Sequence, residues 1–149
     1  MAQLESPWVE RKDGLWLGIQ LPGAIGQVDI VTFGSILLHL RDPFLALWNG
    51  ARLTKSSVIV TDIFPRRLLP ARFALSRFPV SIFGPGGRGG SHETWWWLSP
   101  RTIQRMLSVL GFEESVVSYH HQLYQGRSMK LFTVVAKRTA GQPDMTPVP

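Results

Sequence analysis

The sequence contains no cysteine, which excludes disulfide bonds, thiolate metal sites and cysteine nucleophiles. Charged residues are also few, at 17% of the 149 residues, whereas hydrophobic residues make up 44%, so a wholly disordered chain is excluded. No apolar run is long enough to cross a membrane, and the N-terminus mixes acidic and basic residues where a signal peptide is apolar. We therefore expect a soluble, cytoplasmic protein with one folded core.

Basic residues outnumber acidic ones by 16 to 10, and twelve of the basic residues are Arg, which suits bidentate contact with carboxylates and phosphates. The stretch between Asp62 and Glu93 has five Arg, no acidic residue and interleaved Phe residues. Recognition of single-stranded RNA uses this combination, so RNA is one expected partner. A solvated loop that buries its Phe residues explains the same pattern. The five residues are Arg66, Arg67, Arg72, Arg77 and Arg88.

Two buried strands joined by a helix are predicted in the first half of the chain. Residues 28–33 are almost continuously β-branched or aromatic, which is typical of a strand covered on both faces, and residues 57–61 repeat that pattern. Between them Asp42 and Pro43 mark the start of a helix that ends near Thr54. Strand, helix and strand at this spacing predict two parallel strands. The expected buried stripe of the helix is Phe44, Leu47, Trp48 and Ala51, and Gly50 weakens the helix by about 1 kcal/mol.

A long loop, a second helix and a hairpin are predicted in the second half. Residues 63–94 contain four Pro and dense Gly, which indicates a loop. Ser99 and Pro100 then begin a helix that Gly111 ends, and residues 115–124 and 131–136 form an antiparallel hairpin whose first strand lies at an edge. The expected buried residues of this helix are Ile103, Met106, Leu107 and Leu110.

Four stretches in this order resemble the C-terminal part of class I, Rossmann-like S-adenosylmethionine-dependent methyltransferases, and look closest to the small-molecule and tRNA wobble-uridine-modifying type. They are residues 29–43 (DIVTFGSILLHLRDP), 57–62, 96–100 and 110–112. The resemblance implies an α/β fold, a partial Rossmann-like sheet of about four strands with a C-terminal antiparallel hairpin, over residues 27–138. Residues 1–26 form an N-terminal segment in which 10–18 resemble the helix after the second strand of that family. Residues 139–149 are expected to be disordered.

The sequence departs from this family at the cofactor-binding glycine turn, because no Gly-x-Gly-x-Gly lies between a strand and a helix. The N-terminal, glycine-loop half of the fold is thus expected to be missing, and the isolated chain is expected to bind S-adenosylmethionine weakly or not at all. Residues 28–33 would then form an exposed sheet edge, which predicts pairing with a second copy or with a complete methyltransferase.

The resemblance also implies a site at the turn after the first strand. There Thr32, Phe33, Gly34 and Ser35 would face S-adenosylmethionine, and a plain turn of small residues is the competing interpretation. His39 would act as a base or hydrogen-bond donor at the acceptor site, or would cap local backbone. The acceptor side would also hold Arg41, Trp95, Trp96 and Trp97.

Two functions are consistent with these expectations. One is methyl transfer from S-adenosylmethionine to a small molecule or nucleoside. The alternative is a non-catalytic methyltransferase-like module that binds RNA or regulates a partner. No metal site is expected, because nothing fixes a spacing between His92, Glu93 and the later histidines.

Overall fold

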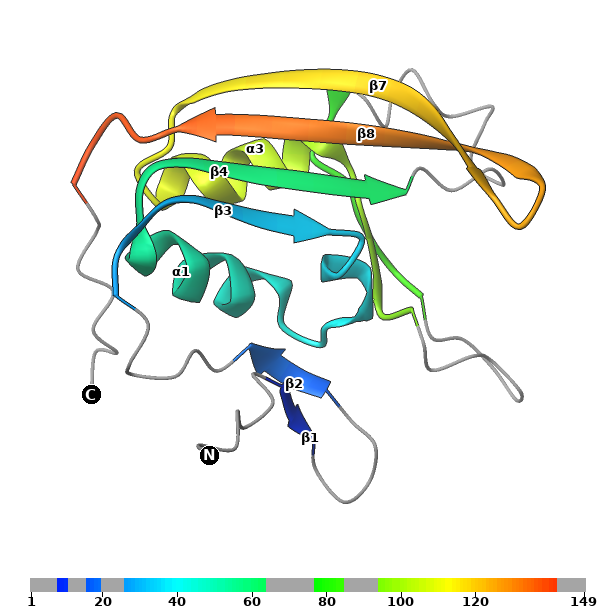
Figure 1. Ribbon diagram of the computed structural model, residues 1–149, viewed down its shortest axis with the longest axis horizontal. Helices are drawn as coiled ribbons and strands as arrows, with labels where there is room; N and C mark the ends of the chain where they lie inside the picture. Colours follow the sequence, from blue (N-terminus) through cyan, green and yellow to red (C-terminus); the bar gives the residue numbers. More distant parts are fainter. Residues whose placement is uncertain (1–7, 11–15, 20–25, 64–76, 85–93, 142–149) are drawn as a thin grey trace, which may run out of the picture.

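The computed structural model describes residues 8–10, 16–19, 26–63, 77–84 and 94–141, and its centre is a four-stranded sheet (Figure 1). The strand order is β3-β4-β8-β7. β3 runs parallel to β4, β4 is antiparallel to β8, and β8 is antiparallel to β7. The strands are β3 (Val28–Gly34), β4 (Thr54–Ile63), β7 (Glu114–Tyr124) and β8 (Arg127–Lys137). The predicted parallel pair and the predicted C-terminal hairpin are both confirmed.

The helix between the parallel strands is α1 (Pro43–Leu53), and it begins where the sequence predicts. One carboxylate oxygen of Asp42 accepts a 2.8 Å hydrogen bond from the N–H of Leu45, and Pro43 occupies the first helical position. Leu47 and Ala51 of the predicted stripe are fully buried, whereas Phe44 and Trp48 are half-buried at its margin.

Gly50 lies on the buried side of α1, against β3. A Cβ added at Gly50 would lie only 2.7 Å from the ring of Phe33 and 3.1 Å from a methyl group of Val31. The glycine that weakens the isolated helix therefore allows Phe33 to pack against it.

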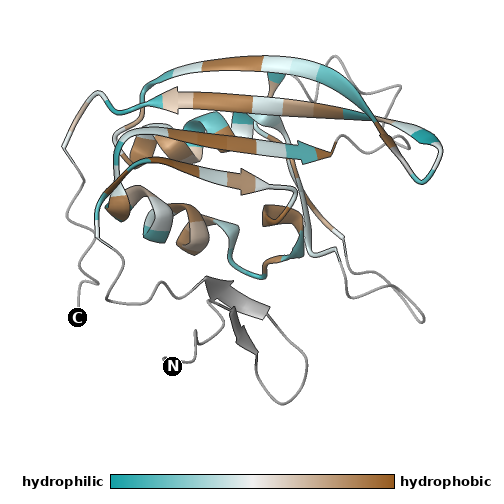
Figure 2. Cartoon of the chain, viewed as in Figure 1, coloured by the Kyte–Doolittle hydropathy of each residue, from teal (hydrophilic) through white to brown (hydrophobic). Residues whose placement is uncertain are grey.

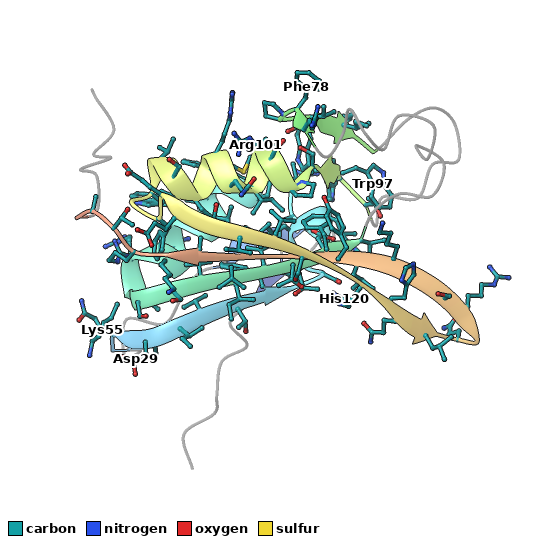
Figure 3. The ribbon with its side chains drawn as sticks, turned by 90° about the horizontal axis from the view of Figure 1, so that it is seen from above. Asp29, Lys55, Phe78, Trp97, Arg101 and His120 are labelled. Atoms are coloured by element: carbon teal, nitrogen blue, oxygen red, sulfur yellow. The ribbon has the colours of Figure 1, made fainter. Side chains whose placement is uncertain are left out.

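Both described helices lie on the same face of the sheet, as Figure 3 shows for α3 (Pro100–Val109). One core joins the helices to alternate residues of the strands, because successive side chains of a strand point to opposite faces. Its members include Phe33, Leu47, Val58, Val60, Ile103, Leu107, Phe112, Phe132 and Val134. On the opposite face Ile30 is 53% exposed and Thr32 is exposed. The prediction that residues 28–33 are covered on both faces is therefore wrong for the part of the chain described, because α1 and α3 cover only one.

Ser99 fixes the start of α3 and joins it to the segment before β5 (Ser81–Phe83). Its hydroxyl accepts hydrogen bonds from the N–H groups of Thr102 and Val80 and donates one to the carbonyl of Phe78. β5 pairs with β6 (Trp96–Leu98), so two short strands lie within or beside the region predicted as a loop. At the other end Gly111 adopts a φ of +87°, which confirms the predicted helix stop.

The hairpin of β7 and β8 turns through Gln125 and Gly126, which both have positive φ angles, as the tightest hairpins require. The turn is strongly hydrophilic (Figure 2) and lies beyond the last residue of β4 that pairs with β8.

β7 is at one end of the strand order, as predicted, and β3 is at the other. Among the described strands β3 pairs only with β4, and pairing of its other edge with a partner stays a prediction.

The N-terminal segment contains strands rather than the predicted helix. β1 (Trp8–Glu10) pairs antiparallel with β2 (Trp16–Ile19). The helix prediction for residues 10–18 is wrong for the residues described there, because Trp, Val and Ile favour strands and Gly14 and Gly18 disfavour helices. Several residues named in the sequence predictions lie outside the described residues, namely Arg66, Arg67, Arg72, Arg88, His92, Glu93 and residues 142–149. Neither described helix is long and apolar enough to cross a membrane.

Candidate functional site

The turn after β3 has an unusual backbone and open space beside it. Ser35 adopts a φ of +49°, which is uncommon for a residue with a side chain. Its backbone N–H donates a 2.7 Å hydrogen bond to the carbonyl of Thr61 on β4, and this bond holds the turn in place. Apart from the two adjacent residues, no atom of the described part of the chain would lie within 4 Å of a Cβ added at Gly34. Because strain of this kind gathers at ligand sites, the turn is a candidate site.

The four residues predicted to face a cofactor have different surroundings. The side chain of Thr32 is exposed and that of Ser35 is half-buried. Phe33, in contrast, is 4% exposed and packs in the core, so only its backbone is left to face a ligand at this turn. Gly34 is exposed, in agreement with the open space beside it.

A single 3₁₀ turn, η1 (Leu37–His39), connects the β3 turn to α1. Leu37 and Leu38 are buried, whereas the side chain of His39 is half-buried. The N–H of His39 donates to the carbonyl of Ile36 at 3.0 Å. His39 therefore lies between the β3 turn and Arg41, and a catalytic role for it stays a prediction.

Arg41, Trp95 and Trp96 come together next to η1, although more than 50 residues separate Arg41 from the tryptophans. The N–H of Trp95 donates to the carbonyl of Leu38 at 2.7 Å, and the indole N–H of Trp96 donates to the carbonyl of Arg41 at 2.9 Å. The guanidinium of Arg41 lies 4.7 Å from the centre of the Trp95 ring, which is a cation–π contact. The structure thus places these three predicted acceptor-side residues in one cluster.

Phe83 joins this cluster from β5. Its ring centre is 6.2 Å from that of Trp95 and 5.2 Å from that of Trp96, and 55% of the residue is exposed. Sequence reasoning placed Phe83 only among the aromatic residues of a loop, because the pairing of β5 with β6 has no sequence signature. We call Arg41, Phe83, Trp95 and Trp96 the Arg–aromatic cluster. Trp97 lies beside it in β6, paired with Ile82 of β5, and lies towards the opposite end of the sheet from Asp29 and Lys55 (Figure 3).

Asp62 is a buried carboxyl group near the end of β4, one residue after the Thr61 carbonyl that holds the β3 turn. It is 4% exposed, and one of its carboxyl oxygens accepts a hydrogen bond from the N–H of Ile63 at 2.7 Å. Burial raises the pKa of Asp62 to about 7, although the hydrogen bond from Ile63 opposes that shift. From the sequence, Asp62 was noted only as the boundary of the Arg-rich stretch that ends at Glu93. The sequence did hold a signal for Asp62, because it is an acidic residue directly after an apolar strand that is predicted to be parallel. Ligands of open α/β sheets bind beyond the carboxyl ends of such strands.

Within the ranges that the structure describes, no three His, Asp or Glu residues gather closely enough to hold a metal ion. The candidate site consists of a strained polar turn, a buried carboxyl group and the Arg–aromatic cluster, which are connected through β3, β4 and η1.

No family model matches the chain, and no curated protein matches it. Solved structures do match it. The N-terminal domain of EvdMO1 with S-adenosylhomocysteine bound is 18% identical, with a TM-score of 0.48, over 76% of this chain and 48% of that one. Magnesium protoporphyrin IX methyltransferase of Synechocystis, with the same ligand bound, is 17% identical, with a TM-score of 0.45, over 78% and 48%. A candidate methyltransferase of Bacillus halodurans is 13% identical, with a TM-score of 0.47, over 81% and 68%.

The class of fold follows from the topology. One parallel strand–helix–strand unit, a second helix on the same face and a terminal antiparallel hairpin form the arrangement predicted for the C-terminal part of a class I methyltransferase sheet. The predicted α/β fold is therefore confirmed. The chain spans about half the length of the EvdMO1 domain and of the Synechocystis methyltransferase. The resemblance to the wobble-uridine-modifying type stays a prediction.

Proposed function

We propose that this chain is a methyltransferase-type domain that uses S-adenosylmethionine to methylate a small molecule or nucleoside. In this proposal the turn at Gly34 and Ser35 faces the methionine end of the cofactor. The acceptor is held on the neighbouring Arg–aromatic cluster, with His39 between the two.

The open space beside Gly34 is the observation that carries this proposal. Close approach to the backbone there is supported by its surroundings, since apart from the adjacent residues no atom of the described residues would lie within 4 Å of an added Cβ. The turn also lies at the carboxyl end of a parallel strand, where ligands of such sheets bind. These two observations support placing the methionine end of the cofactor at this turn.

The chemistry divides between the cofactor and the protein. Bound S-adenosylmethionine supplies an activated methyl group, so the protein has to position the acceptor in line with it and exclude water. The backbone at Gly34 and Ser35 would orient the cofactor, and the Arg–aromatic cluster would orient the acceptor. His39 would hold or accept a proton of the acceptor.

The experiment is a titration of the full chain with S-adenosylhomocysteine, followed by the backbone amide NMR signals. We expect saturable shifts at residues 32–35 with a Kd on the order of 1 mM, because the sequence has no glycine turn of the usual type to add further contacts. Gly34→Val fills the open space and is expected to abolish these shifts. Gly26→Val is the matched control, since a Cβ added at Gly26, just before β3, would likewise have no contact within 4 Å among the described residues beyond its neighbours in the chain.

The alternative function, a non-catalytic module, gives a different result. That function is favoured by the missing glycine turn. It predicts no saturable shift with S-adenosylhomocysteine, or equal shifts in the Gly34→Val and Gly26→Val variants. Either result would overturn the proposed function.

A further inference from the structure

Arg41 is an exposed residue whose guanidinium lies against the Trp95 ring and makes no hydrogen bond to another described residue. Within the part of the chain described, it makes no ion pair with a carboxylate and donates no side-chain hydrogen bond. Its acidic neighbour Asp42 is already engaged, because the Asp42 carboxylate caps α1 through the N–H of Leu45. The charge of Arg41 is thus available to a ligand.

The surroundings of Arg41 restrict where its charge can lie. The indole of Trp96 holds the Arg41 backbone at 2.9 Å, and the ring of Trp95 lies under the guanidinium at 4.7 Å. Trp95 itself is fixed at both backbone groups, since its N–H donates to Leu38 and its carbonyl accepts from Gly84 at 2.7 Å. A planar guanidinium held this way loses little freedom on binding, which favours recognition of a flat, two-oxygen anion.

The aromatic members of the cluster add a second binding element beside this charge. Phe83 contacts both tryptophans, and it is more than half exposed. An aromatic or other flat molecule can therefore stack there while its acidic group reaches Arg41.

We infer that the Arg–aromatic cluster binds a flat acceptor that carries an anionic oxygen group, either a carboxylate or a phosphate. This inference rests on the proposed function, because it names the substrate class of the same site. Arg41 pairs with the two anionic oxygens, and Phe83 and the tryptophans contact the flat part of the molecule.

The test uses three probes of similar shape on the full chain: benzoate, phenyl phosphate and neutral benzamide. Binding is followed through the side-chain indole N–H signals of Trp95 and Trp96. We expect both acids to bind with a Kd at least tenfold lower than that of benzamide, as measured from the shifts of these signals. The affinities of the two acids are then compared. Tighter binding of benzoate indicates a carboxylic acceptor, and tighter binding of phenyl phosphate indicates a phosphorylated one such as a nucleotide.

Two matched variants separate a site from general attraction to a basic protein. Arg41→Gln is expected to remove the preference for acids. Arg52→Gln removes the same charge at a similar pair, in which the Arg52 guanidinium lies 5.6 Å from the Trp48 ring, and is expected to leave binding unchanged. Equal affinity for benzamide and the acids, or equal losses in both variants, would overturn the inference.

This inference and the proposed function can fail separately. S-adenosylhomocysteine is scored at the backbone amides of residues 32–35, whereas the acidic probes are scored at indole signals. Acid binding without cofactor binding would leave the anion site in place and refute the methyltransferase function, and the converse result would refute only the anion site.

Discussion

The indole N–H of Trp96 donates a 2.9 Å hydrogen bond to the backbone carbonyl of Arg41. This bond joins β6 to the segment between η1 and α1 across more than 50 residues of sequence. A second link runs alongside it, from the N–H of Trp95 to the carbonyl of Leu38. Together they hold the Arg–aromatic cluster beside the β3 turn.

Trp96→Phe keeps an aromatic ring against Phe83 but removes the donor to Arg41. We expect a loss of about 1 kcal/mol in the free energy of unfolding, because one hydrogen bond to a solvent-accessible carbonyl is lost and a smaller ring fills the site. Urea unfolding measures this change. Hydrogen exchange should also become faster at the Leu40 amide, which closes η1 on Leu37.

Trp97→Phe is the control for this variant. Trp97 lies in the same strand, and its indole makes no hydrogen bond within the described ranges. Its replacement should leave the exchange rate at Leu40 unchanged. The same acceleration in both variants would show that the Trp96 bond does not hold η1.

Asp62→Asn is expected to change how stability depends on pH. The pKa of Asp62 is raised from 3.8 to about 7 by burial, so the folded state binds the proton more tightly than the unfolded state. The stabilising contribution of the protonated carboxyl is therefore complete below pH 3.8 and is lost as the pH rises to about 7. At 1.36 kcal/mol per pKa unit the loss is roughly 4 kcal/mol.

Asparagine cannot ionise, so the variant should gain stability relative to the unchanged chain as the pH rises from 4 to 8. Urea unfolding at a series of pH values measures the difference between the two proteins. A pH-independent difference for Asp62→Asn would contradict the raised pKa.

Gly50→Ala tests the close packing of α1 on β3. Alanine favours a helix by about 1 kcal/mol over glycine, so the isolated helix gains. The added methyl would collide with the ring of Phe33, however, and overpacking of a core costs typically 1–3 kcal/mol. We expect a net loss of about 1 kcal/mol in the free energy of unfolding.

A double-mutant cycle with Phe33→Leu identifies the cause of that loss. The smaller side chain makes room for the methyl, so Gly50→Ala should cost less, or stabilise, in the Phe33→Leu background. Equal costs in both backgrounds would show that Phe33 is not the residue that requires glycine at position 50.

The sequence by itself determined the elements whose signals are local. The Asp42–Pro43 and Ser99–Pro100 pairs placed both helix starts correctly, because capping and proline geometry depend on adjacent residues. Gly111 marked the end of α3, and the β-branched runs marked β3, β4 and the hairpin. The resemblance, not a local signal, was wrong in the N-terminal segment, where it predicted a helix over 10–18 and the described residues form β1 and β2.

Only the tertiary structure decided which of these residues meet. The sequence did not indicate that β5 pairs with β6, and this pairing brings Phe83 to Trp95 and Trp96. Nor did it reveal that Phe33 turns into the core, that Gly50 makes room for it or that burial raises the pKa of Asp62. Each of these depends on which face of the sheet the helices cover, and that choice rests on contacts between residues far apart in the chain.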